Sequence, residues 1–222
     1  MNLEIFFKEK KNLAILSIFF LVVLTIFIII YFETKNEYKY EQEEYLIQIG
    51  FFEDYLTKFT ELDEKIISEM VGGLLFLYKE IPEIIDKVSA IELLAIGIVE
   101  TNFKNIKGDN GNSLGYFQIQ APTYWYLKYE YLDIYENIDF LLPWYWDNVE
   151  GRADVQIITA ALYLYDLKIR YGEEMAYSMY NGGSETYEDK ITYTMSWLNV
   201  KYDQYTSSRN TFQGEIIPEK AF

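Results

Sequence analysis

The stretch Leu94-Ala-Ile-Gly-Ile-Val-Glu100-Thr-Asn-Phe103 decides the organisation of this chain, together with Gly115-Tyr-Phe-Gln-Ile119 further on. The first stretch has the composition of an apolar helix that ends in one glutamate and runs into a polar loop. We expect burial among apolar neighbours to disfavour the charged form of Glu100 and to raise its pKa toward neutrality. A carboxyl group in that state can act as a general acid, as cleavage of a glycosidic bond requires.

Helical patterns fill most of the remaining sequence, and few stretches alternate between polar and apolar residues, so the predicted fold class is mainly α. An amphipathic helix is expected from Tyr38 to about Met70, with an interruption at Val71-Gly72-Gly73. The other expected helices run from Ser89 to about Thr101, from Arg152 to Tyr171 with Gly172 as its C-cap, from Glu173 to Tyr180 and from Asp189 to about Tyr202, and shorter segments begin at Leu74, Pro82 and Ala121.

The segment from Asn12 to Phe32 carries no charged residue and consists mainly of Leu, Ile, Val and Phe. As a helix it is long enough to cross a bilayer core of about 30 Å. Lysines precede it and glutamates follow it, so the positive-inside rule places the N-terminus in the cytoplasm and the rest in the periplasm or at the cell surface. The alternative is a cleaved signal peptide, but its apolar region would span about 7–15 residues and end in small residues.

These features predict a single-pass membrane protein with one folded domain. The expected parts are a cytoplasmic tail (1–11), a transmembrane helix (12–32), a helical stalk with N-terminal helices (33–80), a folded domain (81–205) and a C-terminal tail (206–222).

The amino-acid composition excludes several classes of partner and of catalytic site. A formal net charge of −16 argues against a nucleic-acid partner, because affinity for phosphate backbones comes largely from clustered Lys and Arg. The chain contains no Cys and no His, which leaves no disulfide, no Ser-His nucleophile and no typical zinc site. Catalysis would therefore use carboxylates, amides, hydroxyls and aromatic rings, and we expect no cofactor and no metal.

The loop from Lys107 to Ser113 is rich in turn-forming residues and can return the segment around Gln118 to the side of Glu100. Gln118 offers an amide donor and acceptor to sugar hydroxyls, and Tyr116 offers a face for stacking on a sugar ring. Asn181 follows a predicted helix end at Tyr180 and is free to form hydrogen bonds.

Four segments follow one another in the chain: Glu100-Thr-Asn-Phe103, Gly115-Tyr-Phe-Gln-Ile119, Ser178-Met-Tyr-Asn-Gly-Gly183, and Tyr193 within Ile191-Thr-Tyr-Thr-Met195. Together they resemble the motifs of the lysozyme-like soluble lytic transglycosylase (SLT) family. The resemblance covers roughly residues 91–200, and both the order and the spacing from Glu100 to Gly115 agree with the family.

The resemblance implies a lysozyme-like helical domain that cleaves the β-1,4 bond between N-acetylmuramic acid and N-acetylglucosamine in peptidoglycan glycan strands. Glu100 would take the acid/base role and leave 1,6-anhydro-muramic acid ends. Tyr193 would match the tyrosine that hydrogen-bonds the catalytic carboxyl. The expected substrate-binding residues are Ser113, Tyr116, Gln118, Tyr180, Asn181 and Tyr193, and an envelope-spanning apparatus is a further candidate partner.

Departures from the family pattern keep other activities open. Asp109 stands where the family often has Ser, and its surroundings are first of all a turn sequence. A second carboxylate beside Glu100 could activate water, because inverting glycosidases hold two carboxyls about 6.5–9.5 Å apart. The alternatives are thus a hydrolytic muramidase that uses Glu100 with Asp109, and a non-catalytic peptidoglycan-binding or assembly protein.

Overall fold

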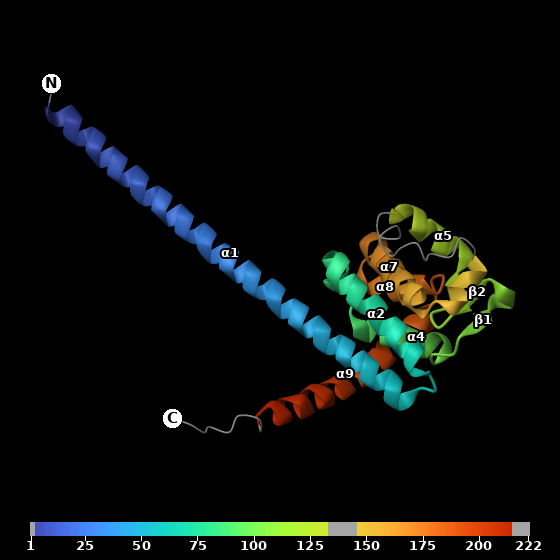
Figure 1. Ribbon diagram of the computed structural model, residues 1–222. Coiled ribbons are helices and arrows are strands. Elements are labelled where there is room, and N and C mark those ends of the chain that lie inside the picture. Colours follow the sequence, from blue (N-terminus) through green and yellow to red (C-terminus); the bar gives the residue numbers. More distant parts are fainter. Residues whose placement is uncertain (1–2, 133–145, 215–222) are drawn as a thin grey trace. The chain divides into compact units, whose positions relative to one another are not determined.

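A computed structural model describes residues 3–132 and 146–214 (Figure 1). The chain divides into two compact units, residues 1–43 and residues 44–222. The first unit is formed by the N-terminal part of helix α1 (Leu3–Phe59), whose remaining residues belong to the second unit. The expectation of a mainly helical protein is confirmed.

The expected transmembrane helix at 12–32 falls within α1. The side chains of residues 1–20 lie outside the described part of the chain, and with them the first part of this segment. Among the residues searched, namely those that the structure describes, no helix combines the length and the apolar character needed to cross a membrane.

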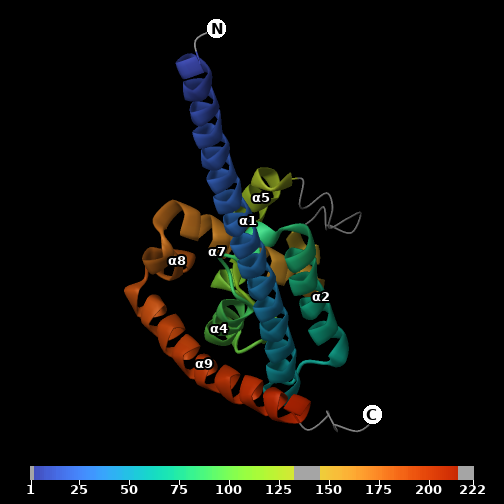
Figure 2. The same cartoon turned by 90° about the vertical axis from the view of Figure 1, so that its left-hand side faces the viewer.

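The second unit is a helical assembly built around the long buried helix α7 (Ala153–Tyr171), which contacts α2 (Glu64–Glu80), α4 (Ala90–Thr101), α5 (Ala121–Glu130) and α8 (Glu173–Tyr180). Helix α9 (Glu185–Gly214) runs past α4 and α8, as Figure 2 shows. Short elements complete the helices: α3 (Pro82–Ile85) and the 3₁₀ helices η1 (Asp109–Gly111) and η2 (Trp146–Gly151).

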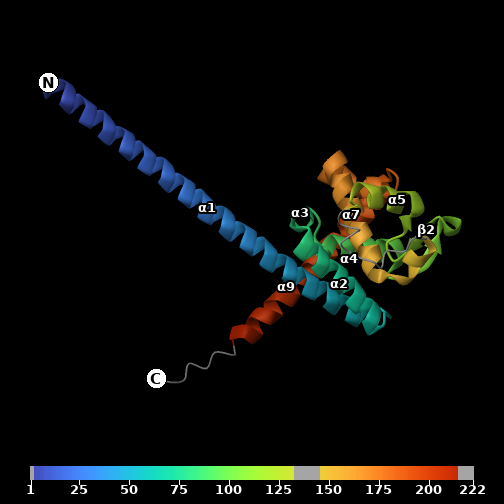
Figure 3. The ribbon, with the colours of Figure 1, turned by 45° about the horizontal axis from the view of Figure 1, so that its top comes forward.

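A small antiparallel sheet follows α4 and lies beside α5 and α7 (Figure 3). Its strands are β1 (Ile106–Gly108), β2 (Ser113–Gly115) and β3 (Ile119–Gln120), in the order β1-β2-β3. The register pairs Lys107 with Leu114, and Leu114 with Ile119. Strands of this length are too short to show a period of two, which is why the sequence pattern did not reveal them.

The second compact unit begins at Glu44, so it includes the end of α1 and helix α2 in addition to the folded domain expected at 81–205. The apolar side chains of these two helices are buried together with those of α4 and α7. Examples are Phe52, Leu56, Leu74 and Leu77, which are at most 1% exposed.

Two helix boundaries also differ from the expectation. Helix α1 ends at Phe59, and α2 then runs without a break through Gly72 and Gly73. Gly73 allows α2 to approach α7 closely, because a Cβ atom there would lie 2.6 Å from a methyl carbon of Ile157. At the other end, α9 continues past 206, where a tail was expected.

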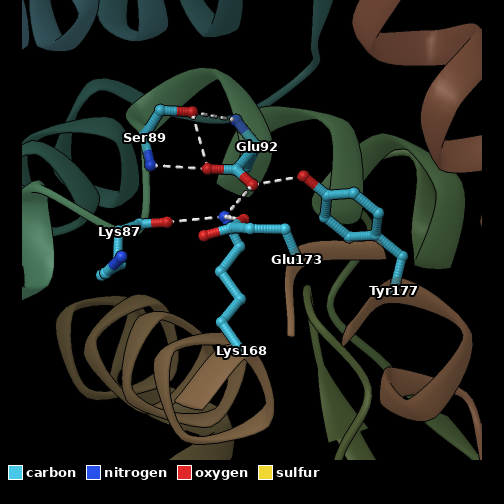
Figure 4. Close-up of polar contacts among 6 residues, drawn as sticks. All are labelled: Lys87, Ser89, Glu92, Lys168, Glu173 and Tyr177. Atoms are coloured by element: carbon cyan, nitrogen blue, oxygen red, sulfur yellow. Dashed lines mark hydrogen bonds and ion pairs between the residues drawn. The ribbon is translucent and has the colours of Figure 1, made fainter. Parts of the chain in front are cut away.

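A buried ionic cluster ties α4 to α7 and α8 (Figure 4). Lys168 Nζ lies 2.6 Å from Glu92 Oε1, and both side chains are less than 10% exposed. The same ammonium donates to the carbonyl of Lys87, and the Tyr177 hydroxyl donates to Glu92. Glu92 also accepts from the backbone N–H of Ser89 at 2.8 Å and so completes the capping box that starts α4.

Candidate active site

A cavity of about 400 Å³ opens between the small sheet and the helices of the second unit. The residues that line it extend along the chain from Glu100 at the end of α4 to Gly182 after α8. Most of the lining side chains are polar. They are Glu100, Asp109, Ser113, Gln118, Ile119, Gln120, Thr123, Tyr163, Tyr180, Asn181 and Gly182.

Glu100 reaches the cavity from the last turn of α4. The helix stops immediately afterwards, because Asn102 adopts the left-handed conformation at the C-cap (φ 51°) and Phe103 follows with φ 55°. Phe103 then folds back over α4, where Gly97 leaves room for its ring. Glu100 is thus half-buried on a rigid element with its carboxyl group toward the cavity.

The carboxyl group of Glu100 accepts a hydrogen bond of 2.7 Å from the hydroxyl of Tyr187, near the start of α9. Burial raises the pKa of Glu100 above its ordinary value, the Tyr187 hydrogen bond lowers that pKa, and the nearby charge of Asp109 raises it; the net direction is upward. The group is therefore protonated at a higher pH than a solvent-exposed glutamate, which suits a general acid.

Gln118 holds the loop that faces Glu100. Its backbone lies in the left-handed region (φ 48°), which turns the side chain back onto the sheet. The amide nitrogen donates to the carbonyls of Ile106 (3.0 Å) and Gly115 (2.9 Å), and the amide oxygen accepts from Ser113 (2.9 Å). Both amide hydrogens are thereby engaged, so Gln118 offers a ligand chiefly the remaining capacity of its oxygen.

Asp109 lies at the start of η1, on the wall of the same cavity. Its carboxylate is within 3.2 Å of the Ser113 hydroxyl, which also faces Gln118. Since a hydroxyl has one hydrogen, Ser113 serves one of these two acceptors at a time. The cavity thus holds two carboxyl groups, and a hydroxyl and an amide lie beside the second of them.

The end of α8 forms the opposite part of the wall. Tyr180 is buried, donates to the carbonyl of Phe117 at 3.2 Å and stacks on Tyr187 with an interplanar angle of 2°. Burial raises the pKa of Tyr180 far above its ordinary value, so the phenol stays neutral. Asn181 follows as the C-cap of α8, is exposed, and leads into Gly182 (φ 68°) and Gly183 (φ 91°). These glycines make the turn possible.

Two expected site residues lie elsewhere. Tyr116 is 4% exposed and does not line the cavity, so its ring is not available for stacking on a sugar. Its backbone N–H donates to the side chain of Gln156 and its carbonyl accepts from Thr101, which fixes the loop against α4 and α7. Tyr193 is 77% exposed on α9, and the hydrogen bond expected from it is supplied by Tyr187.

The structure therefore brings together Glu100, Asp109, Ser113, Gln118, Tyr180 and Asn181 around one cavity. It adds lining residues that the sequence did not single out, namely Gln120, Thr123 and Tyr163. Tyr163 lies on α7 with its ring 4.9 Å from that of Tyr180. No motif marks these positions, because they meet only through the packing of α5 and α7.

In the part of the chain that the structure describes, no three His, Cys, Asp or Glu side chains form a group suited to a metal ion. Comparisons with protein-family models, with curated proteins and with solved structures find no match for this chain. The site must therefore be interpreted from its own chemistry.

Proposed function

We propose that this protein is a peptidoglycan lytic transglycosylase that cleaves the β-1,4 bond between N-acetylmuramic acid and N-acetylglucosamine with Glu100 as its acid/base. The observation that carries the proposal is Glu100 itself, a half-buried carboxyl with a raised pKa at a polar cavity of about 400 Å³. The order of the motifs that resemble the SLT family supports the substrate assignment.

The proposed reaction uses one carboxyl group twice. Protonated Glu100 first donates its proton to the glycosidic oxygen as the bond to the anomeric carbon breaks. The resulting carboxylate then accepts the proton of the muramic acid C6 hydroxyl as that oxygen bonds to the anomeric carbon. Glu100 ends the cycle protonated, and the product carries a 1,6-anhydro ring without the addition of water.

The second candidate activity is hydrolysis, and Asp109 is the observation that favours it. Asp109 lines the same cavity as Glu100 and its charge acts on Glu100. A carboxylate placed there could remove a proton from attacking water, as in an inverting glycosidase. The two reactions differ in product, since hydrolysis leaves a reducing end and the transglycosylase leaves an anhydro end.

We also propose that the chain is anchored in the cytoplasmic membrane through residues 12–32, with its domain in the periplasm or at the cell surface. The support is the uncharged sequence of this segment and the lysines that precede it. Fractionation of cells that express the full chain tests this, since an anchored protein resists alkaline carbonate extraction and a peripheral protein is released.

The function is tested by incubating the detergent-purified full chain with purified peptidoglycan and analysing the soluble products by mass spectrometry. We expect anhydro-muropeptides from the parent and a rate lower by about 10²–10⁴-fold from Glu100→Gln, the range typical of a lost general acid. Glu53→Gln is the matched control, because Glu53 is an exposed helical glutamate far from the cavity lining in sequence.

Other outcomes are equally informative. Reducing-end products that depend on Glu100 would establish the muramidase. Saturable association with peptidoglycan, unchanged by Glu100→Gln and without soluble fragments, would overturn catalysis and leave a binding or assembly protein.

A further inference from the structure

The charged residues among those described in the cavity lining are all acidic. Glu100 and Asp109 are its acidic residues, and no Lys or Arg is among the described residues that line it. The remaining lining side chains are hydroxyls, amides, phenols and one aliphatic group. A ligand in this cavity thus meets up to two negative charges and no cation from the described lining.

Two basic side chains, one on the small sheet and one at the start of α7, are paired with other carboxylates. Lys107 of β1 lies 3.0 Å from Glu150, and Arg152 before α7 lies 2.6 Å from Asp154. The whole chain has a formal net charge of −16, so long-range fields add to the local effect and do not oppose it. The cavity is therefore a region in which an additional anion is disfavoured.

Muramic acid itself carries a negative charge only when the carboxyl group of its lactyl ether is free. Its lactyl ether ends in a carboxyl group that is joined as an amide to the stem peptide in intact peptidoglycan, and the amide is uncharged. When the peptide is removed at this bond, the lactyl group becomes a free carboxylate directly attached to the sugar ring. The charges of an intact stem peptide lie further out, on the peptide itself.

Resting on the proposed function, we propose that the cavity accepts glycan strands whose lactyl groups are amidated by peptide and discriminates against denuded strands with free lactyl carboxylates. Asp109 is the specificity-determining residue, because it is the acidic residue of the described lining that the proposed transglycosylase reaction does not use. The enzyme then acts on strands before the class of amidase reactions that strips their peptides.

The test compares three substrates made from one peptidoglycan preparation and cleaved by the full chain in detergent. They are peptide-bearing strands, strands denuded by an amidase, and denuded strands whose lactyl carboxylates are coupled to methylamine. We expect about tenfold slower cleavage of denuded strands at low salt, the size of one repulsion of about 1.4 kcal/mol across a partly screened distance. Methylamine coupling restores the rate, since it removes the charge without restoring the peptide.

Two further measurements test whether the discrimination is electrostatic and whether it depends on Asp109. The preference for peptide-bearing strands shrinks at about 0.5 M salt, because screening weakens repulsion between charges that solvent reaches. Asp109→Asn raises the rate on denuded strands relative to peptide-bearing strands several-fold. Asp203→Asn, which removes an exposed carboxylate on α9, leaves the ratio of the two rates unchanged.

The outcomes separate this inference from the proposed function. Equal rates on peptide-bearing and denuded strands, or methylamine-coupled strands that remain slow, would overturn the charge discrimination while the transglycosylase stands. The absence of products from all three substrates would overturn the proposed function itself. The methylamine comparison needs no variant, so it decides the question even if Asp109→Asn fails to fold.

Discussion

At the scale of single residues, Glu100 experiences opposing influences on its pKa. Burial and the charge of Asp109 raise it, whereas the phenol of Tyr187 lowers it by donating to the carboxylate form. Burial is the largest of these, so the pKa is raised. Tyr187 thus limits how far the pKa rises and holds the carboxyl group in one orientation.

Replacement of Tyr187 by Phe removes the hydrogen bond and retains the ring that stacks on Tyr180. Because the lost bond lowered the pKa of Glu100, that pKa rises further. The alkaline limb of the pH profile of kcat/KM, where the acid loses its proton, is expected to move to higher pH. Tyr193→Phe on the same helix is the control and should leave the limb in place; a move to lower pH in Tyr187→Phe would contradict the assigned role.

The raised pKa of Glu100 also has a consequence for stability. A carboxyl whose pKa is higher in the folded than in the unfolded chain favours folding while it is protonated, and this contribution is lost as pH rises from its ordinary 4.5 through the folded value. Glu100→Gln mimics the protonated form at every pH. We therefore expect Glu100→Gln to have a higher Tm than the parent at pH 7.

Thermal unfolding followed by circular dichroism at pH 7 and pH 4 measures this difference. It should shrink at pH 4, where Glu100 is mostly protonated in both the folded and the unfolded parent. The exposed substitution Glu53→Gln should show no comparable dependence on pH. If Glu100→Gln is less stable than the parent at pH 7, burial does not disfavour the charged form of Glu100 in the folded protein.

At the scale of elements, Lys168 joins α4, α7 and the start of α8. Lys168→Met keeps a long apolar side chain but leaves Glu92 buried without its cation. Removal of one partner from a buried ion pair typically costs about 3–5 kcal/mol, so we expect a fall of that size in the free energy of unfolding. Urea denaturation measures it, and the exposed substitution Lys190→Met is the control.

A second substitution distinguishes a lost charge pair from lost packing. Adding Glu92→Gln to Lys168→Met removes the uncompensated charge and should recover part of the stability. A double variant that is as unstable as the sum of the single variants would assign the loss to packing and not to the ion pair.

The helices show which boundaries can be predicted from sequence patterns and which cannot. Glu173 to Tyr180 is a helix as expected, and α7 and α4 begin one residue after the expected positions because Arg152 and Ser89 act as N-caps. Ser89, which forms a capping box at the start of α4, and Gly172, which ends α7, are boundary residues that the sequence marks. The break between Phe59 and Glu64 was not predicted. The sequence pattern placed the interruption at Gly72 and Gly73 instead, but α2 continues through both, and Gly73 marks a close contact with α7.

The site was predictable where local motifs determine it. Glu100, Gln118 and Asn181 stand at ends or turns that the sequence marks, and all three line the cavity. The resemblance pointed to Tyr193, whereas the tyrosine of α9 that donates to Glu100 is Tyr187, which lies before the expected helix start at Asp189. Tyr193 follows Tyr187 by six residues, which is roughly 240° around the helix, so only one of them can face Glu100.

At the scale of the whole molecule, the position of the domain boundary depends on burial and not on sequence resemblance. The motifs begin near residue 91, but the compact unit begins at Glu44. The preceding segments contribute fully buried side chains to the core that supports α4 and α7, and hence the cavity. Within the end of α1 and helix α2, the apolar side chains with at most 1% exposure are Phe52, Leu56, Met70, Leu74 and Leu77.

These buried residues predict the outcome of truncation. A fragment from Lys39 to Phe222 contains the whole compact unit and should unfold cooperatively in urea. A fragment that begins at Ile81 lacks the five side chains above, each worth about 1.5–3 kcal/mol when buried, whereas a whole domain is stable by only about 5–15 kcal/mol. It should therefore lack a cooperative transition and peptidoglycan cleavage, although it retains Glu100 and every residue that lines the cavity. A cooperatively folded fragment from Ile81 would show instead that the end of α1 and helix α2 are accessory to the domain.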